Sequence, residues 1–211
     1  MRSILVVNPK GGCGKTTIAT NLATYYAVWD TSIALVDLDP QQSSMEWLRV
    51  RPDTENKIQG FNGLKGKIFP KPDTVRVIYD APARTDNNKV ARLIKLVDVV
   101  IIPVLPSAID IRVAATFIAE ITKKVRANNA DAFIGVVANR TQKNYQSYTA
   151  LMNFLKTLNI PIIGALRNSQ NYIKAADTGV GIFEMPVSEV KKDMEEWEPI
   201  IGWVEGKPTV K

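Results

Sequence analysis

The stretch VVNPKGGCGKTTIA occupies residues 6–19 and joins a short apolar run to a segment with helical spacing. The triplet GKT at residues 14–16 closes the phosphate-binding pattern G-x-x-x-x-G-K-[ST]. The pattern's opening glycine would fall at residue 9, which is Pro9, and a second lysine, Lys10, lies inside the loop. Three glycines let the backbone turn its N–H groups toward an anion at the N-terminus of the following helix: Gly11, Gly12 and Gly14. The stretch therefore predicts a loop that binds the phosphates of a nucleotide.

The side chains at the end of this loop have separate expected tasks. The ammonium of Lys15 neutralises the β- and γ-phosphates, and the hydroxyl of Thr16 ligates Mg²⁺. Thr17 reaches the α-phosphate. The expected cofactor-binding residues of the loop are Gly11, Gly12, Cys13, Gly14, Lys15, Thr16 and Thr17.

Composition limits the chemistry that the rest of the chain can perform. The 211 residues suffice for one substantial core, so we expect a single domain over residues 1–211. Cys13 is the only cysteine and histidine is absent, which excludes an internal disulfide, a multi-cysteine metal centre and histidine catalysis. The opening apolar run is too short for a signal peptide, so a cytoplasmic protein is expected. The net charge of +6 is compatible with a polyanionic partner but does not establish one.

Short β-branched apolar runs alternate with longer segments of helical spacing. Continuous hydrophobicity in the runs indicates strands buried on both faces of a parallel sheet. The expected strands are Ser3–Val7, Ser32–Val36, Val75–Tyr79, Val97–Pro103, Phe133–Ala138 and Pro161–Gly164. The expected helices are Lys15–Trp29, Gln41–Val50, Asn87–Leu96, Ser107–Ala127 and Tyr145–Leu158, with Ser107 as an N-cap. This order predicts an α/β fold with a doubly wound, mostly parallel sheet flanked by helices. Residues 51–71 are interpreted as a surface excursion with one short strand pair.

Residues 10–17, KGGCGKTT, resemble the deviant phosphate loop K-G-G-x-G-K-T-[ST] of the ParA/MinD ATPases. In that family the first glycine is missing, and the extra lysine reaches the phosphates bound by the other subunit. The resemblance implies a P-loop NTPase of the SIMIBI type with ATP and Mg²⁺ as cofactors. It also implies an ATP-dependent homodimer, in which Lys10 acts in trans much as an arginine finger does. Lys10 and Lys15 are thus expected catalytic cations.

Two acidic strand ends strengthen the resemblance. Residues 34–41, ALVDLDPQ, resemble the family's D-x-D-P-Q segment, which implies that Asp39 positions the attacking water and that Asp37 lies nearer the metal. Residues 77–83, VIYDAPA, resemble the Walker-B strand and switch, which implies that Asp80 holds Mg²⁺ through water. Alone, the first segment is equally compatible with an acidic turn that closes a strand. The metal-binding residues implied are Thr16, Asp37 and Asp80.

Two further points of the resemblance concern the ends of the site. The segment VVANR at residues 136–140 resembles a strand-end N-R that contacts adenine, with a simple turn at Asn139 as the alternative. Asn139 and Arg140 are therefore expected to bind the base. After Asp80, residues 81–84 are expected to sense the γ-phosphate, although Ala83 and Arg84 replace the usual second proline.

The C-terminal sequence separates members of this superfamily. Residues 188–204 carry five acidic side chains, the wrong sign for a helix that binds an anionic bilayer, so no membrane partner is expected. A single cysteine cannot serve an iron–sulfur carrier. The remaining expectation is nonspecific DNA binding, for which the candidate contacts are Arg167, Lys174, Lys191 and Lys192, with Lys123, Lys124 and Arg126 as a second cluster. A solvated helix end is the alternative for each.

The resemblance thus implies a ParA-type ATPase that binds DNA nonspecifically as an ATP dimer and segregates a plasmid or chromosome. A ParB-like adaptor would stimulate hydrolysis, and the ATP-bound protein would be nucleoid-associated. No N-terminal helix-turn-helix precedes the phosphate loop, so operator binding is not expected. Three alternatives stay open: positioning of a protein cargo such as a microcompartment or chemoreceptor cluster, a MinD-like membrane-cycling division regulator, and a metabolic ligase such as dethiobiotin synthetase.

Overall fold

A computed structural model describes residues 1–29, 32–65, 68–84, 86–127, 132–158 and 160–206. Within this part of the chain the central element is a sheet of seven strands, all paired in parallel. The strands are β1 Arg2–Val6, β2 Ile33–Asp37, β3 Gln59–Asn62, β4 Arg76–Asp80, β5 Val99–Val104, β6 Phe133–Thr141 and β7 Ile162–Arg167. Their order across the sheet is β3-β2-β4-β1-β5-β6-β7.

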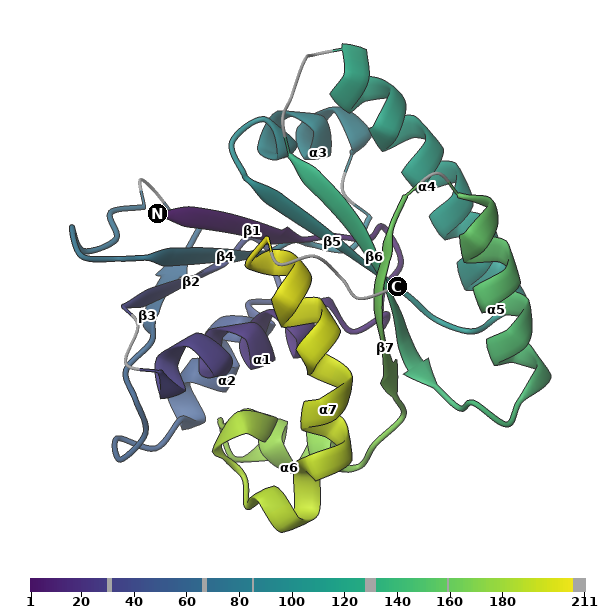
Figure 1. The fold of residues 1–211 in the computed structure, drawn as a ribbon. Helices are drawn as coiled ribbons and strands as arrows, with labels where there is room; N and C mark the ends of the chain where they lie inside the picture. Colours follow the sequence, from purple (N-terminus) through teal and green to yellow (C-terminus); the bar gives the residue numbers. More distant parts are fainter. Residues whose placement is uncertain (30–31, 66–67, 85, 128–131, 159, 207–211) are drawn as a thin grey trace.

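Helices cover both faces of this sheet (Figure 1). One face carries α1 Lys15–Val28, α2 Ser43–Val50, α6 Asn171–Asp177, the 3₁₀ helix η1 Ile182–Glu184 and α7 Val187–Val204. The opposite face carries α3 Asn87–Ile94, α4 Ala108–Ala127 and α5 Gln146–Thr157. The chain turns from one face to the other around β1, so the carboxyl ends of β1, β4 and β5 form a topological switch point, where such sheets bind ligands. The predicted doubly wound α/β fold is confirmed.

The sheet is stable because its central strands are apolar on both faces. All five residues of β2 and all six of β5 are buried. On the α1 and α7 side the core includes the fully buried Trp197, and on the other side it includes Phe117 and Ile121 of α4. Two buried layers explain why the strand segments of the sequence show continuous hydrophobicity rather than alternation.

Most predicted elements lie within a few residues of their observed bounds, but residues 51–71 differ. Those of them that the structure describes form no strand pair of their own. Instead β3 joins the edge of the main sheet, where Gly60 pairs in parallel with Leu35 of β2. The four-residue strand is short and only half-buried, so its sequence lacks the apolar run that marks the other strands.

Local side-chain contacts fix one end of each of two helices. Ser107 caps α4 as predicted, since its Oγ accepts a hydrogen bond from the backbone N–H of Asp110 over 3.1 Å. After α2, the guanidinium of Arg51 forms a buried ion pair with Glu184 of η1 and donates to the carbonyl of Gly179 over 3.1 Å. The C-terminal end of α2 is thereby attached to the layer formed by α6 and η1. In the described residues, no helix has both the length and the apolar character required to cross a bilayer.

Candidate functional site

The phosphate loop lies between the end of β1 and the start of α1, where the sequence predicts it. Gly12 and Gly14 have φ angles of 75° and 93°, in the left-handed region that favours glycine. Gly14 is also constrained by space, because a Cβ there would lie 2.1 Å from the side-chain amide nitrogen of Asn139. The backbone path of the loop therefore requires glycine at both positions.

The ammonium of Lys15 is held inside this loop. The residue is only 7% exposed, and its Nζ donates to the backbone carbonyl of Lys10 over 3.0 Å. The Cys13 thiol donates to the same carbonyl over 3.2 Å, and burial raises its pKa, so it remains a neutral thiol. A buried cation in a glycine-rich loop at a helix N-terminus is suited to the phosphates of a nucleotide.

The side chain of Asn8 supports the phosphate loop, a role that the sequence did not indicate. Its side-chain amide donates to the carbonyl of Pro103 on β5 over 2.6 Å, and its Oδ1 accepts from the backbone N–H of Lys10 over 2.8 Å. The path of the chain at Lys10 is thus fixed from a neighbouring strand. The predicted action of the Lys10 side chain on a second subunit stays a prediction.

The carboxylate of Asp80, at the end of β4, lies beside the first turn of α1. Its Oδ2 accepts hydrogen bonds from Thr16 Oγ1 at 2.7 Å and from Ser44 Oγ at 2.6 Å. Its Oδ1 is buried and has no hydrogen-bond partner in the described part of the chain. Burial raises the pKa of Asp80 to about 6, although the two hydroxyls oppose that shift. A buried carboxylate with one unsatisfied oxygen next to a hydroxyl fits Mg²⁺ or its bound water, so Thr16 and Asp80 would hold this ion.

Both carboxylate oxygens of Asp37, at the end of β2, accept hydrogen bonds from backbone N–H groups. Its Oδ1 accepts from the backbone N–H of Asp39 at 2.9 Å, and its Oδ2 accepts from those of Ser44 at 2.8 Å and Met45 at 3.2 Å. Burial raises the pKa of Asp37, while these three N–H groups oppose the rise. In this structure Asp37 caps the N-terminus of α2, and its role near the metal stays a prediction.

Asp39 links two of the loops at this edge of the sheet. Its Oδ1 accepts from the backbone N–H of Gln41 at 2.9 Å, and its Oδ2 accepts from that of Ala83 at 3.3 Å. The next residue, Arg84, donates its backbone N–H to the carbonyl of Pro9 over 2.9 Å. The loops after β1, β2 and β4 are therefore hydrogen-bonded to one another, which brings Asp39 to the same edge as the phosphate loop. Its action on water stays a prediction.

Asn139, expected to contact adenine, also braces the phosphate loop. Its side chain is buried and donates to the carbonyl of Cys13 over 2.8 Å. Arg140 follows with a φ angle of 51° and an exposed side chain. The structure thus adds a structural role for Asn139 that the sequence did not indicate, and base binding by the two residues stays a prediction.

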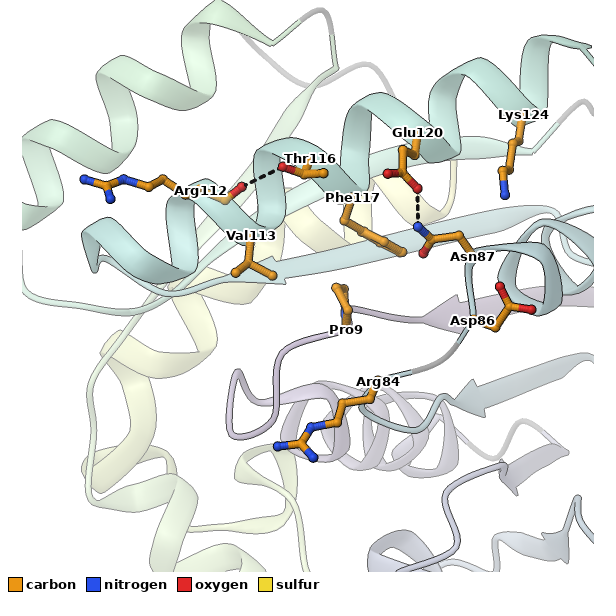
Figure 2. A pocket seen from close by; sticks show the side chains of 10 residues that line it. All are labelled: Pro9, Arg84, Asp86, Asn87, Arg112, Val113, Thr116, Phe117, Glu120 and Lys124. Carbon is orange, nitrogen blue, oxygen red and sulfur yellow. Dashed lines mark hydrogen bonds between the residues drawn. The ribbon is translucent and has the colours of Figure 1, made fainter.

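A hollow of about 780 Å³ opens beside the phosphate loop (Figure 2). Pro9 comes from that loop, Arg84 and Asp86 from the segment after β4, and the remaining lining residues from α3 and α4. Figure 2 shows a hydrogen bond from Asn87 to Glu120 that links α3 to α4 at its rim. The hollow therefore lies between the phosphate loop and α4.

The candidate DNA contacts differ in their exposure and in their partners. Arg167 is committed to the buried carboxylate of Asp193, with Nε–Oδ1 at 2.6 Å and Nη2–Oδ2 at 3.0 Å. Lys191 and Lys192 are exposed on α7, as is Lys174 on α6. In the second cluster, Lys123 is exposed, Lys124 donates to Asn88 Oδ1 over 2.8 Å, and the side chain of Arg126 lies outside the described residues. DNA binding at any of these positions stays a prediction.

Comparison with known proteins agrees with this geometry. Residues 4–182 match the family described as CobQ/CobB/MinD/ParA nucleotide binding domain. The chain is 27% identical to the maintenance of carboxysome distribution protein A of Halothiobacillus neapolitanus over 190 residues, 87% of each protein. It is 43% identical to the chromosome-partitioning ATPase Soj of Thermus thermophilus over 72 residues, 33% of this chain and 28% of that protein.

A solved structure shares the fold across nearly the whole chain. It is a Borrelia burgdorferi B31 protein described as a plasmid partition protein and bound to AMPPNP. The two align with a TM-score of 0.72 and 17% identity, over 96% of this chain and 99% of the other. The family match covers most of the sequence and the phosphate loop has the arrangement that the motif requires. This chain belongs to the MinD/ParA family of nucleotide-binding proteins.

Proposed function

We propose that this chain is a ParA-type ATP hydrolase that forms an ATP-dependent homodimer, binds DNA nonspecifically and segregates a plasmid or chromosome. The observation that carries the catalytic part is the Thr16–Asp80 pair, whose free carboxylate oxygen lies beside the loop that holds the buried ammonium of Lys15. Phosphoryl transfer to water depends on positioning and charge compensation, and these groups supply both.

The mechanism assigns one task to each side chain. Lys15 and the N–H groups of residues 11–16 bind the triphosphate, and Thr16 and Asp80 hold Mg²⁺, which when bound neutralises charge on the phosphate oxygens. Asp39 accepts a hydrogen bond from the attacking water and orients it toward the γ-phosphate. Ala83, which shares a hydrogen bond with Asp39, connects this water site to the segment after β4. Basal hydrolysis is slow because the second Lys10 is missing until two chains meet.

Nucleotide-dependent assembly tests this proposal. Lys10→Ala is expected to abolish dimerisation with a nonhydrolysable ATP analogue while the monomer still binds nucleotide. Lys15→Ala is expected to lose nucleotide binding itself, because it removes the buried cation of the loop. Size-exclusion chromatography with ADP and with the analogue, combined with fluorescent-nucleotide binding, separates the two effects. A Lys10→Ala protein that dimerises as the parent does would contradict the trans-acting role.

DNA binding is tested by retardation of a fragment of arbitrary sequence in the presence of ATP or ADP. Retention only with ATP is expected, because only the dimer presents two copies of the exposed lysines of α6 and α7. In cells the ATP-bound protein would then be nucleoid-associated. If the protein sedimented with anionic liposomes in the presence of ATP but did not retard DNA, a membrane-cycling regulator would be favoured instead.

Positioning of a protein cargo is the second candidate. It is favoured by the similarity to a carboxysome distribution protein over 87% of both chains. The catalytic residues serve either cargo, so the distinction lies with the adaptor. A ParB-like protein that raises the ATPase rate and binds a centromere site would favour plasmid or chromosome partition. Stimulation by an adaptor that binds a protein shell and no DNA site would favour the second candidate.

A further inference from the structure

Ser44 contributes a second hydroxyl to the carboxylate of Asp80. The serine lies in the first turn of α2, it is fully buried, and its Oγ donates to Asp80 Oδ2 over 2.6 Å. Thr16 donates to the same oxygen from α1 over 2.7 Å. Two donors from two different helices therefore converge on one oxygen of the carboxylate.

This arrangement determines how the carboxylate is oriented. With Oδ2 occupied by both hydroxyls, rotation about the Cβ–Cγ bond of Asp80 would break two hydrogen bonds to a charged group. The other oxygen, Oδ1, is buried and without a partner in the described part of the chain. The two hydroxyls thus keep Oδ1 available for a different donor.

Ser44 is itself fixed on its other side. Its backbone N–H donates to Asp37 Oδ2 over 2.8 Å, at the end of β2. Since β2 and β4 are paired, with Asp37 opposite Asp80, the serine lies in a closed set of contacts between two neighbouring strand ends. Its hydroxyl position is set by the sheet and does not depend on the exposed face of α2.

Resting on the proposed function, we propose that Ser44 is a positioning residue for the magnesium site, which orients the Asp80 carboxylate so that Oδ1 accepts from Mg²⁺-bound water. Ser44 does not touch the ion. Partners of this kind typically contribute about 10- to 100-fold to metal affinity. Ser44 also joins α2, the helix that follows Asp39, to the metal-binding carboxylate.

Titration of Mg²⁺ against protein bound to a fluorescent derivative of ADP tests this inference. Ser44→Ala is expected to weaken the apparent Mg²⁺ affinity by about 10-fold, while affinity for the nucleotide in EDTA stays as in the parent. Ser43→Ala is the matched control, because Ser43 is exposed on the same helical turn. ATP hydrolysis by Ser44→Ala should require a higher Mg²⁺ concentration than hydrolysis by the parent. Its rate at saturating Mg²⁺ should be almost unchanged.

The outcomes separate the two proposals. A parent whose nucleotide binding ignores Mg²⁺ would overturn both the proposed function and the role of Ser44. A parent that requires Mg²⁺, together with a Ser44→Ala protein of equal Mg²⁺ affinity, would overturn the role of Ser44 alone. A lower melting temperature with unchanged Mg²⁺ affinity would also overturn it, since the hydroxyl would then only pack α2. If Ser44→Ala fails to fold, Ser44→Cys keeps the volume with a weaker donor and must shift the affinity in the same direction.

Discussion

The side-chain amide of Asn139 donates a hydrogen bond to the backbone carbonyl of Cys13, 126 residues earlier in the chain, over 2.8 Å. This contact joins the end of β6 to the phosphate loop, and both groups are buried. The side-chain amide thereby supplies a donor to a buried carbonyl of the loop, which would otherwise lose a hydrogen bond.

Removing this amide should loosen the loop. Asn139→Ala leaves the Cys13 carbonyl buried without a donor, and we expect the free energy of unfolding to fall by about 1–3 kcal/mol. Urea denaturation in the absence of nucleotide measures this loss. Arg140→Ala, at the exposed neighbouring position, is the control and should leave stability unchanged. A stable Asn139→Ala protein with weakened ATP binding would show that the residue acts on the base alone.

Gly14→Ala tests the close approach between the loop and Asn139. The added Cβ would lie 2.1 Å from the amide nitrogen, and the φ angle of 93° is strained for alanine. We expect loss of nucleotide binding, measured by fluorescent-ADP titration. The double variant Gly14→Ala/Asn139→Ala should remain defective, because the backbone strain persists after the contact is relieved. Full recovery in the double variant would show that crowding alone causes the defect.

Asp39→Ala should separate ATP binding from hydrolysis. The carboxylate contacts backbone N–H groups of exposed or half-buried loops, so its removal should leave the fold intact while the attacking water loses its acceptor. We expect a dimer that retains ATP and stays on DNA, measured by phosphate release and DNA retardation. Glu46→Ala, an exposed carboxylate on α2, is the control. Hydrolysis at the parental rate in Asp39→Ala would contradict the assignment.

The ion pair between Arg167 and Asp193 predicts a pH dependence of stability. Burial opposes ionisation of Asp193, but hydrogen bonds from Arg167 and Asn171 outweigh it and lower its pKa. A carboxylate whose pKa is lower in the folded state stabilises the fold at pH values above its unfolded pKa, and this contribution is lost as pH falls through the folded value. Chemical denaturation from neutral to acid pH should show a loss that is absent in Asp193→Asn.

Removal of one partner of this pair should lower the free energy of unfolding by more than the loss of an exposed ion pair would. Arg167→Ala leaves a buried carboxylate without its cation, and because the Arg167 side chain is itself 36% exposed, we expect a loss of about 1–3 kcal/mol. The variant is therefore unsuitable as a test of DNA binding. A loss below about 1 kcal/mol would show that solvent or a neighbouring group replaces the guanidinium.

Lys191→Glu/Lys192→Glu tests DNA binding on α7 without disturbing the core, because both side chains are exposed. We expect weaker retention of DNA with ATP and a smaller dependence on salt. The parent is expected to make several phosphate contacts. Raising the salt from about 50 to 200 mM should therefore reduce its affinity for DNA by roughly 10³-fold. Lys174→Glu reports on α6 in the same assay. Unchanged salt dependence in the α7 variant would show that DNA binds at another surface, and Lys123 would be the next position to test.

Much of this site could be predicted from sequence because its motifs are local. The phosphate loop is contiguous, and Asp39 and Asp80 each follow a buried apolar strand whose carboxyl end must meet the others at one edge. The contributions of Asn8, Ser44 and Asn139 could not be predicted. Each depends on a contact between segments that only the strand order brings together, and a buried serine or asparagine has no distinctive periodicity.

The same limit explains the errors in the fold. β3 joins the sheet through register with β2, although its own residues are only half-buried. The partner of Arg167 could not be predicted either, because Asp193 lies 26 residues later on another element; DNA binding at Arg167 stays a prediction. Charge in a sequence indicates which residues can meet an anion, and the fold decides whether that anion is already part of the protein.

The buried ion pair between Arg51 and Glu184 has a mechanical consequence for α2. It immobilises the far end of this helix, whereas the near end is attached to Asp37 and Asp80 at the site. Sliding of the whole helix would break this ion pair, whereas a tilt of the near end would keep it. Because the Asp39 loop leads directly into that near end, a change around the Asp80 carboxylate would reach the loop through Ser44.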